Sequence, residues 1–426
     1  MREGERGVLV GIVVAVGFAC RAGFTWAAPA PVIADAAEYA QYAKNLAAHG
    51  VFSLASTVPP APDSFRSPGY PAVLAACRWL GGEGGWQTLA LGLQVLLGTL
   101  TVLLTYRLVR GFAGFAPALF AAALCALSPH LVVSTSYVLT ECVATFAVVA
   151  SAWLVLGATL RRRLLGGALA AGAAVLCNET LVFVPVVLGV WLWRRSRAHA
   201  VSFTLLALLP LCLWTVRNQV QPLARHGSER VTASISHGSY PGMVHCDPRL
   251  CGYPYREDPE QPAFGASWSA LGSVLAERVA ADPWRYAVWY ACQKPVWLWS
   301  WPLVQGRDVH VYEVSNSPYD RQATMVALHG AMKFAHLPVM LLALGGALLG
   351  VLRRNAAGPV RALGWLALLG TLAYLPVIPD PRYLQPIRPL LFALAAAAVA
   401  GAPAWLLARL RPRPAMDAAA QPVPGN

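Results

Sequence analysis

The sequence predicts an all-α fold, a polytopic transmembrane helical bundle of about ten spans. Of its 426 residues, 57% are hydrophobic and 12% are charged, and the mean hydropathy is +0.51. Soluble domains carry about 25% charged residues. The apolar residues form long blocks that are almost free of charge and recur along the whole chain. Most of these blocks approach the roughly 20 residues that a helix needs to cross the hydrocarbon core.

The net charge of +13 does not indicate a nucleic-acid-binding protein. The basic residues gather in short clusters at the ends of apolar blocks, such as 161–163 and 194–197. No surface of mixed aromatic and basic residues, typical of nucleic-acid interfaces, lies between these clusters. Because basic residues favour the cytoplasmic side of a membrane, the clusters orient the spans and predict that both termini are cytoplasmic.

The predicted spans follow from the apolar blocks and from these basic clusters. They are 7–28, 86–109, 112–128, 141–160, two short helices within 164–193, 200–216, 324–351, 362–378 and 386–408. The segment 164–193 is predicted to turn at Asn178 and Glu179, because a single span would place Arg194 outside. For 7–28 the alternative is a cleaved signal peptide, although the apolar stretch is long for one.

The segment 285–304 is ambiguous between a span and a helix in the membrane interface. It holds four tryptophans around Lys294 and Pro295, a composition that favours the interface. If it crossed the membrane, the later basic clusters would fall outside.

Residues 1–410 are therefore predicted to form one transmembrane domain, with a first external loop at 29–85 and a second large one at 217–323. The Pro- and Ala-rich end, 411–426, is predicted to be a disordered cytoplasmic tail.

The first external loop is predicted to contain two amphipathic juxtamembrane helices. Apolar residues follow Asp35 at helical spacing, and Gly50 ends the pattern. Ser67 and Pro68 would begin the second helix, ahead of the apolar run 72–80.

Asp35 has two interpretations. It could cap the first helix, with Glu38 completing a capping box. Capping is compatible with catalysis, because the helix terminus would keep this carboxylate ionised and ready to act as a base or as a metal ligand.

Two of the nine cysteines, Cys246 and Cys251, lie in a polar loop, whereas most of the others fall in apolar blocks. A short disulfide between them would suit an oxidising compartment. His245 beside Cys246 makes a metal site an alternative, although two or three candidate ligands are weak support for one.

Several segments together resemble the GT-C superfamily of membrane glycosyltransferases. The similarity is greatest to bacterial relatives of dolichyl-phosphate-mannose–protein mannosyltransferases and of the aminoarabinose transferase that acts on lipid A. The matching segments occur in the family's order and lie at 34–46, 66–71, 128–141, 213–218, 282–286 and 381–386. Each segment alone is weak evidence for the resemblance, and the ordered set is fairly specific. Where Asn178 and Glu179 stand, the family pattern leads one to expect a basic residue.

The resemblance implies roles for individual residues. The family's first acidic position falls on Asp35, as a general base or metal ligand, and its second falls on Glu141. The basic residue before the Pro-Gly-Tyr-Pro run falls on Arg66, a partner for the donor phosphate. Arg217, Arg382 and Tyr383 are predicted to share that task, since they emerge on the outside and arginine binds phosphate oxygens in a fork.

Each of these residues also has a purely structural alternative. Glu141 could only complement a helix dipole, Arg217 and Arg382 could snorkel to the interface, and Arg66 could be a solvated loop charge. A divalent cation, Mg²⁺ or Mn²⁺, between Asp35 and Glu141 would suit two carboxylates and phosphate oxygens, although the sequence does not require one.

The implied activity is transfer of a sugar from a polyprenyl-phosphate donor to a cell-envelope lipid, glycan or protein. It would take place on the extracytoplasmic face of the bacterial inner membrane. One alternative is a transporter or flippase of lipid-linked saccharides, but such proteins usually carry ionisable groups or broken helices at the bilayer midplane. Another alternative is a non-catalytic subunit of a polysaccharide assembly complex. No nucleic-acid partner is expected.

Overall fold

The computed structural model describes residues 2–157, 160–243, 254–353 and 356–410, and these residues are organised as helices without a β-sheet. The helices of the first half are α1 (Glu3–Ala27), α2 (Asp35–His49), α3 (Gly69–Ala113), α4 (Phe115–Leu127), α5 (Pro129–Val133), α6 (Glu141–Leu156), α7 (Leu160–Cys177), α8 (Phe183–Trp193) and α9 (Arg197–Val220). Those of the second half are α10 (Gly227–Gly238), α11 (Gln261–Phe264), α12 (Trp268–Ala281), α13 (Pro283–Val288), α14 (Lys294–Leu298), α15 (Pro318–Arg321), α16 (Ala323–Leu352), α17 (Gly358–Tyr374) and α18 (Arg388–Leu410). The all-α prediction is confirmed.

Five helices in the described residues are long and apolar enough to cross a membrane. They are α1, α3, α9, α16 and the stretch Pro381–Gly401 that includes the first part of α18. Shorter apolar helices, α4, α6, α7 and α8, pack among them. The chain is therefore a multi-pass membrane protein, while the count of ten spans stays a prediction.

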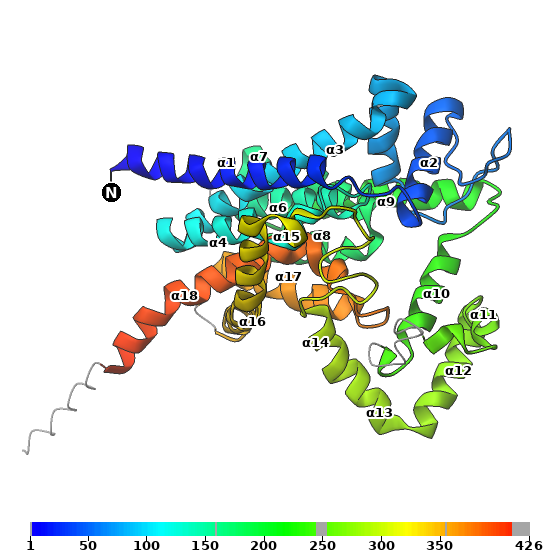
Figure 1. Cartoon of the computed structure of the whole chain (residues 1–426). Coiled ribbons are helices and arrows are strands. Elements are labelled where there is room, and N and C mark those ends of the chain that lie inside the picture. Colours follow the sequence, from blue (N-terminus) through cyan, green and yellow to red (C-terminus); the bar gives the residue numbers. More distant parts are fainter. Residues whose placement is uncertain (1, 158–159, 244–253, 354–355, 411–426) are drawn as a thin grey trace, which may run out of the picture.

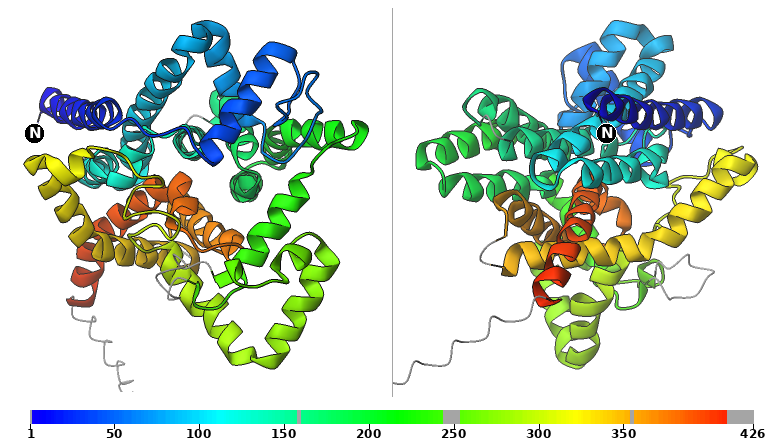
Figure 2. Two further views of the ribbon diagram at one scale, coloured as in Figure 1. Left: turned by 45° about the vertical axis from the view of Figure 1, so that its right-hand side comes forward. Right: turned by 90° about the vertical axis from the view of Figure 1, so that its left-hand side faces the viewer.

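The long helices form a bundle whose two ends differ (Figure 1). The N-terminus of α1 and the far end of α18 lie at the left in Figure 1, and α2 lies at the right. The helices α10 to α13 also project at that right-hand side, where α12 and α13 form a V (Figures 1 and 2). We call the end with α2 and α10 the loop end, and the other the terminal end.

The predicted hairpin within 164–193 is confirmed. Its tip is a short 3-10 turn, Glu179–Val182, and the side chain of Asn178 accepts a hydrogen bond from the Thr180 N–H at 3.0 Å. Gly69 packs against this end of α7, because a Cβ atom placed there would lie 2.6 Å from the Leu176 carbonyl carbon. The start of α3 therefore touches the hairpin near its tip.

The second predicted juxtamembrane helix and the second span are continuous in the structure. They form α3, which is broken only at Gly82, where φ is +62°. Glycine adopts that left-handed conformation without the steric penalty of a side chain. The helix begins at Gly69, with Pro68 in the capping position, so Ser67 does not act as the predicted cap.

The ambiguous segment 285–304 is built of short pieces. Its helix α13 continues through a π-helical turn, Trp289–Gln293, into α14, and Trp284 and Val296 expose most of their side chains. It is not among the five long apolar helices of the described chain. Interfacial placement thus remains the prediction for this segment.

Arg21 lies within α1 yet is 1% exposed. Its guanidinium donates hydrogen bonds to the carbonyls of Gly17, Cys125 and Ala126 at 2.9–3.1 Å. The last two carbonyls close α4, whose C-terminal end carries partial negative charge. This buried arginine therefore joins α1 to α4.

Candidate active site

Asp35 lies between two arginines that come from opposite ends of the sequence. Its Oδ1 accepts a hydrogen bond from Arg66 Nη2 at 2.7 Å, and its Oδ2 accepts one from Arg382 Nη2 at 3.2 Å. Both carboxylate oxygens are thereby engaged by arginine. The capping interpretation of Asp35 is wrong, because the N-cap of α2 is Ala34 and no side chain caps that helix.

Two further carboxylates complete the cluster. Arg66 also donates through Nε to Glu38 Oε2 at 2.6 Å, and Arg382 donates through Nε to Glu141 Oε1. Three acids and two arginines therefore alternate in one chain of ion pairs. We call these five residues the carboxylate–arginine cluster.

The members of the cluster differ in accessibility. The side chain of Asp35 is 32% exposed, whereas that of Glu141 is 10% exposed. Burial alone would raise the pKa of Asp35, but the charges and hydrogen bonds of Arg382 and Arg66 outweigh burial and hold this pKa below its ordinary value of 3.8. Asp35 is thus an ionised carboxylate that a ligand can reach, whereas Glu141, bound to the same arginine, is nearly buried.

Local backbone structure places Asp35. Ala34 has φ +47°, in the left-handed region that a residue with a side chain rarely adopts. This sharp turn starts α2, so Asp35 is the first helical residue and Glu38 follows one turn later on the same face. Both carboxylates therefore reach Arg66.

Arg66 is placed by a loop that is built around the buried Asp63. The Asp63 carboxylate accepts hydrogen bonds from the N–H of Leu54 at 2.7 Å and of Phe65 at 3.1 Å, and another from the Tyr42 hydroxyl. The same loop is hydrogen-bonded to the segment that follows α9: the Ser64 N–H donates to the Arg225 carbonyl, and the Ala224 N–H donates to the Pro62 carbonyl. The two external loops are thus joined beside Arg66.

Arg382 is placed by a turn that precedes α18. The Asp380 carboxylate accepts from the Arg382 N–H at 2.9 Å and from the Gln305 N–H at 2.9 Å. Just before this turn, the side-chain amino group of the fully buried Lys294 donates to the carbonyls of residues 375–377 at 2.6–3.3 Å. Lys294 therefore fixes the strip of backbone that leads to Arg382.

Replacing Lys294 with methionine is expected to destabilise the protein. Three buried carbonyls lose their donor, and leaving a buried acceptor unsatisfied costs about 1–3 kcal/mol, so we expect a total loss of roughly 2–5 kcal/mol after relaxation. Thermal unfolding of the purified protein in detergent measures it. Lys333→Met is the matched control, because Lys333 is exposed and its side chain pairs with Asp308 at 3.1 Å. Equal unfolding temperatures for the two variants would contradict this role of Lys294.

Two buried polar atoms at the cluster have no hydrogen-bond partner in the described part of the chain. They are Glu141 Oε2 and the Tyr312 hydroxyl oxygen. Buried polar groups in proteins are nearly always satisfied by protein, water or ligand. The Arg66 guanidinium carbon also lies 5.4 Å from the centre of the Tyr39 ring.

Arg217 and Tyr383, also predicted to bind the donor phosphate, make other contacts. Arg217 Nη1 donates to the Asp63 backbone carbonyl at 2.8 Å, and its guanidinium lies over the Trp214 ring. Tyr383 stacks on Tyr374 with ring centres 5.3 Å apart. Arg217 therefore supports the loop that carries Arg66, and Tyr383 packs beside Arg382.

Two residues of this region were not singled out as site residues by the sequence. Glu38 was considered only as part of a capping box. Arg230, on α10, donates to Glu179 Oε2 at 2.9 Å and to the Phe65 carbonyl at 2.8 Å. It supplies the positive charge that the family pattern led us to expect at the hairpin tip. No sequence signal connects α10 to that tip.

The sequence also predicted a metal ion and a disulfide, and the structure tests neither. The guanidinium of Arg382 contacts both Asp35 and Glu141. A divalent cation therefore remains only a prediction, and no step below depends on it. Cys246 and Cys251 lie outside the described residues.

The fold resembles that of membrane proteins of the GT-C type, as comparisons with known proteins show. Residues 65–217 match the family model described as dolichyl-phosphate-mannose-protein mannosyltransferase. This match covers about a third of the chain and includes Arg66 and Glu141. No curated protein matches the chain in sequence.

Two solved proteins show the same fold. ArnT from Cupriavidus metallidurans, solved with undecaprenyl phosphate, aligns over 94% of this chain and 60% of its own, with 15% identity and a TM-score of 0.51. The oligosaccharyltransferase of Archaeoglobus fulgidus in the apo form aligns over 96% of this chain and 52% of its own, with 12% identity and a TM-score of 0.51. The chain thus spans little more than half the length of these proteins. The predicted resemblance is confirmed at the level of the fold.

Proposed function

We propose that this chain is a glycosyltransferase that moves a sugar from a polyprenyl-phosphate donor to a cell-envelope acceptor on the extracytoplasmic face. The observation that carries the proposal is the position of Asp35, a reachable carboxylate held between Arg66 and Arg382. Displacing a polyprenyl phosphate from a sugar carbon requires a base on one side and positive charge at the leaving phosphate on the other. The cluster contains both kinds of group within contact distance.

The donor phosphate would compete with carboxylates for the arginines. Arg66 and Arg382 each bind two carboxylates here, and arginine binds phosphate oxygens in the same forked manner. When the phosphate takes part of this coordination, Asp35 loses some of the positive charge that lowers its pKa. Its pKa then rises, which makes Asp35 a better base at the moment when the donor is bound.

The proposed step balances in atoms and charge. The acceptor hydroxyl oxygen attacks the anomeric carbon while Asp35 takes its proton. The bond between that carbon and the phosphate oxygen breaks with both electrons going to oxygen. The released polyprenyl phosphate stays beside Arg66 and Arg382 until it leaves. Attack opposite to the leaving group inverts the anomeric configuration.

The transporter alternative is less well supported by the distribution of charge. The carboxylate–arginine cluster lies at the loop end of the bundle, where α2 and α10 also lie (Figure 1). The buried charge of α1, Arg21, is engaged by backbone carbonyls and joins two helices. It thus has a structural task that requires no transported ion.

The proposed activity is tested with the purified full chain in lipid. It is mixed with polyprenyl-phosphate-linked sugars extracted from membranes of the organism that carries the chain, and with its envelope fraction as acceptor. We expect loss of the sugar from one lipid-linked species and its appearance in the envelope fraction. Cells that lack the chain should accumulate the same donor. Absence of transfer from every extracted donor, together with an unchanged lipid profile in the deleted strain, would contradict the proposal.

A further inference from the structure

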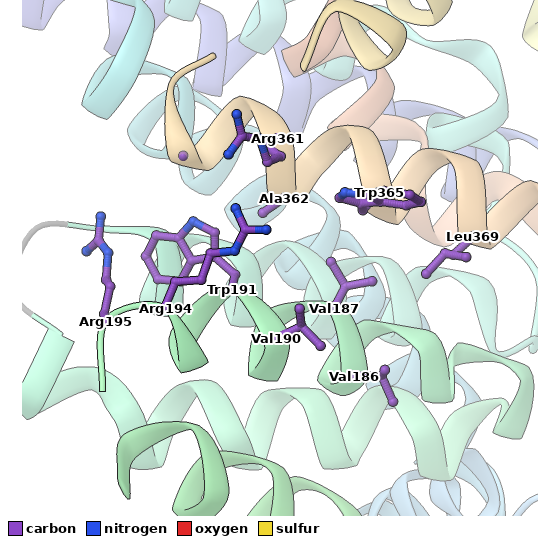
Figure 3. A pocket seen from close by; sticks show the side chains of 11 residues that line it. Val186, Val187, Val190, Trp191, Arg194, Arg195, Arg361, Ala362, Trp365 and Leu369 are labelled. Atoms are coloured by element: carbon purple, nitrogen blue, oxygen red, sulfur yellow. The ribbon is translucent and has the colours of Figure 1, made fainter. Parts of the chain in front are cut away.

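A second place in the molecule combines arginines with an apolar cavity, and it lies away from the carboxylate–arginine cluster. A cavity of about 280 Å³ opens between α8 and α17 (Figure 3). The helix α17 begins at Gly358, which lines this cavity, and ends at Tyr374, whose ring stacks on Tyr383 beside the cluster. At 1.5 Å per residue, the arginine end of the cavity at Arg361 lies about 20 Å along α17 from Tyr374, while the apolar end reaches Leu369.

The wall of the cavity is apolar and open toward the surroundings. It is formed by valines of α8 and by the tryptophan and leucine side chains of α17, with Val190 61% exposed and Trp365 42% exposed (Figure 3). Exposed apolar side chains on the helices of a membrane bundle face lipid. This part of the cavity therefore suits a hydrocarbon chain.

The other end of the cavity is positively charged. Arg194 and Arg195 follow α8, Arg361 lies in the first turn of α17, and Figure 3 shows Arg194 extending toward α17. The Arg195 guanidinium lies 4.1 Å from the centre of the Trp191 ring. None of the 11 residues that line the cavity, all of them described, is acidic. The lining residues themselves thus supply three arginines and no carboxylate.

We propose that this cavity binds an anionic phospholipid of the leaflet at the terminal end of the bundle, with its phosphate at the three arginines. The three arginines would contact the lipid phosphate, and the apolar helix faces beside them would contact the acyl chains. A free phosphate would leave the apolar wall unused. The site is separate from the sugar-transfer site and does not depend on the proposed activity.

Close packing keeps the two sides of the cavity together. A Cβ atom at Gly358 would lie 3.2 Å from Trp191 Nε1, so the start of α17 approaches the indole of α8 directly. The Arg361 side chain also donates to the Arg353 carbonyl at 2.8 Å, which ties the start of α17 to the end of α16. A lipid held here would therefore bridge α8 and α17 at a point where they already meet.

The proposal is tested with the full chain, purified and stripped of lipid in a neutral detergent, to which phosphatidylglycerol or phosphatidylcholine is added. Native mass spectrometry measures binding of each lipid. We expect phosphatidylglycerol to be preferred, and Arg194→Gln with Arg195→Gln to weaken its binding about thirtyfold, since each basic residue near a lipid phosphate contributes roughly fivefold. Val190→Trp, which fills the apolar part, should also weaken phosphatidylglycerol binding.

The matched control replaces two arginines that lie over tryptophan rings outside the cavity, Arg107 over Trp153 and Arg197 over Trp193. Arg107→Gln with Arg197→Gln should leave phosphatidylglycerol binding within twofold of the unchanged chain. Equal loss in this control would mean that the lipid binds to overall charge, and it would overturn the proposal. Displacement of the lipid by excess inorganic phosphate, with no effect of Val190→Trp, would also overturn it in favour of a free-phosphate site.

Discussion

Asp35→Asn is expected to lower the rate of sugar transfer by about a hundred- to ten-thousandfold, the usual contribution of a general base. Asparagine keeps the size of the side chain and still accepts a hydrogen bond from an arginine, but it cannot take the acceptor proton. Because Asp35 is 32% exposed, its loss should change the unfolding temperature only slightly. The measurement is single-turnover transfer at saturating donor, together with thermal unfolding of the same preparation.

Glu38→Gln is the matched control, because Glu38 is 30% exposed and also pairs with Arg66. It removes one carboxylate from the cluster without touching the proposed base, and we expect a loss of transfer below tenfold. Unchanged turnover in Asp35→Asn, or a larger loss in Glu38→Gln, would remove Asp35 from the mechanism.

The pH dependence gives an independent check on Asp35. Its pKa in the free protein lies below the ordinary value of 3.8. The ion pairs of Asp35 therefore stabilise the folded protein above pH 3.8, and this stabilisation is lost as the pH falls through the lowered pKa. The fall of kcat/KM at acid pH, which reports protonation of Asp35 in the free protein, should therefore lie below pH 3.8. In the donor complex, where phosphate competes for the arginines, the acid limb of kcat should lie at higher pH.

Arg382→Gln is expected to reduce both stability and transfer. The change leaves Glu141, which is 10% exposed, without its cation, and breaking a buried ion pair in this way costs about 3–5 kcal/mol. It also removes one of the two arginines that would hold the leaving phosphate. Thermal unfolding and transfer kinetics measure the two effects separately.

The double variant Arg382→Gln with Glu141→Gln separates stability from catalysis. Removing both charges avoids the unpaired carboxylate, so much of the lost stability should return. Transfer should stay low, because the phosphate partner is still missing. Recovery of transfer together with stability would show that Arg382 acts only through folding, and would contradict its proposed role.

The membrane-spanning helices could be predicted from the sequence because their signal is local. A run of apolar residues predicts a helix by itself, and the basic clusters on either side of 164–193 led to the prediction of a turn at Asn178, which the structure confirms. The segment 285–304 stayed ambiguous for the same reason. Its tryptophans and Lys294 suit an interface, and the task of Lys294 appears only when 375–377 are brought beside it.

The candidate site could be predicted only where the family resemblance supplied residues. Asp35, Glu141 and Arg66, which the resemblance supplied, meet Arg382, which was predicted from its place on the outside, although Asp35 and Arg382 are 347 positions apart. Spacing along the chain carries no information at that separation. Local patterns were misleading at Asp35, where a helix start with Glu38 three residues later fits a capping box. In the folded chain the arginines engage both carboxylates instead.

The hydrogen bonds between the loop that carries Arg66 and the segment after α9 have an evolutionary consequence. The Ser64 N–H donates to the Arg225 carbonyl, Arg217 donates to Asp63, and Arg230 donates to the carbonyl of Phe65. These links anchor only the near side of the second external region, at 217–230. Changes within α11 and α12, which precede Lys294 and Gln305, would therefore alter the surface offered to acceptors while these links still hold the loop of Arg66.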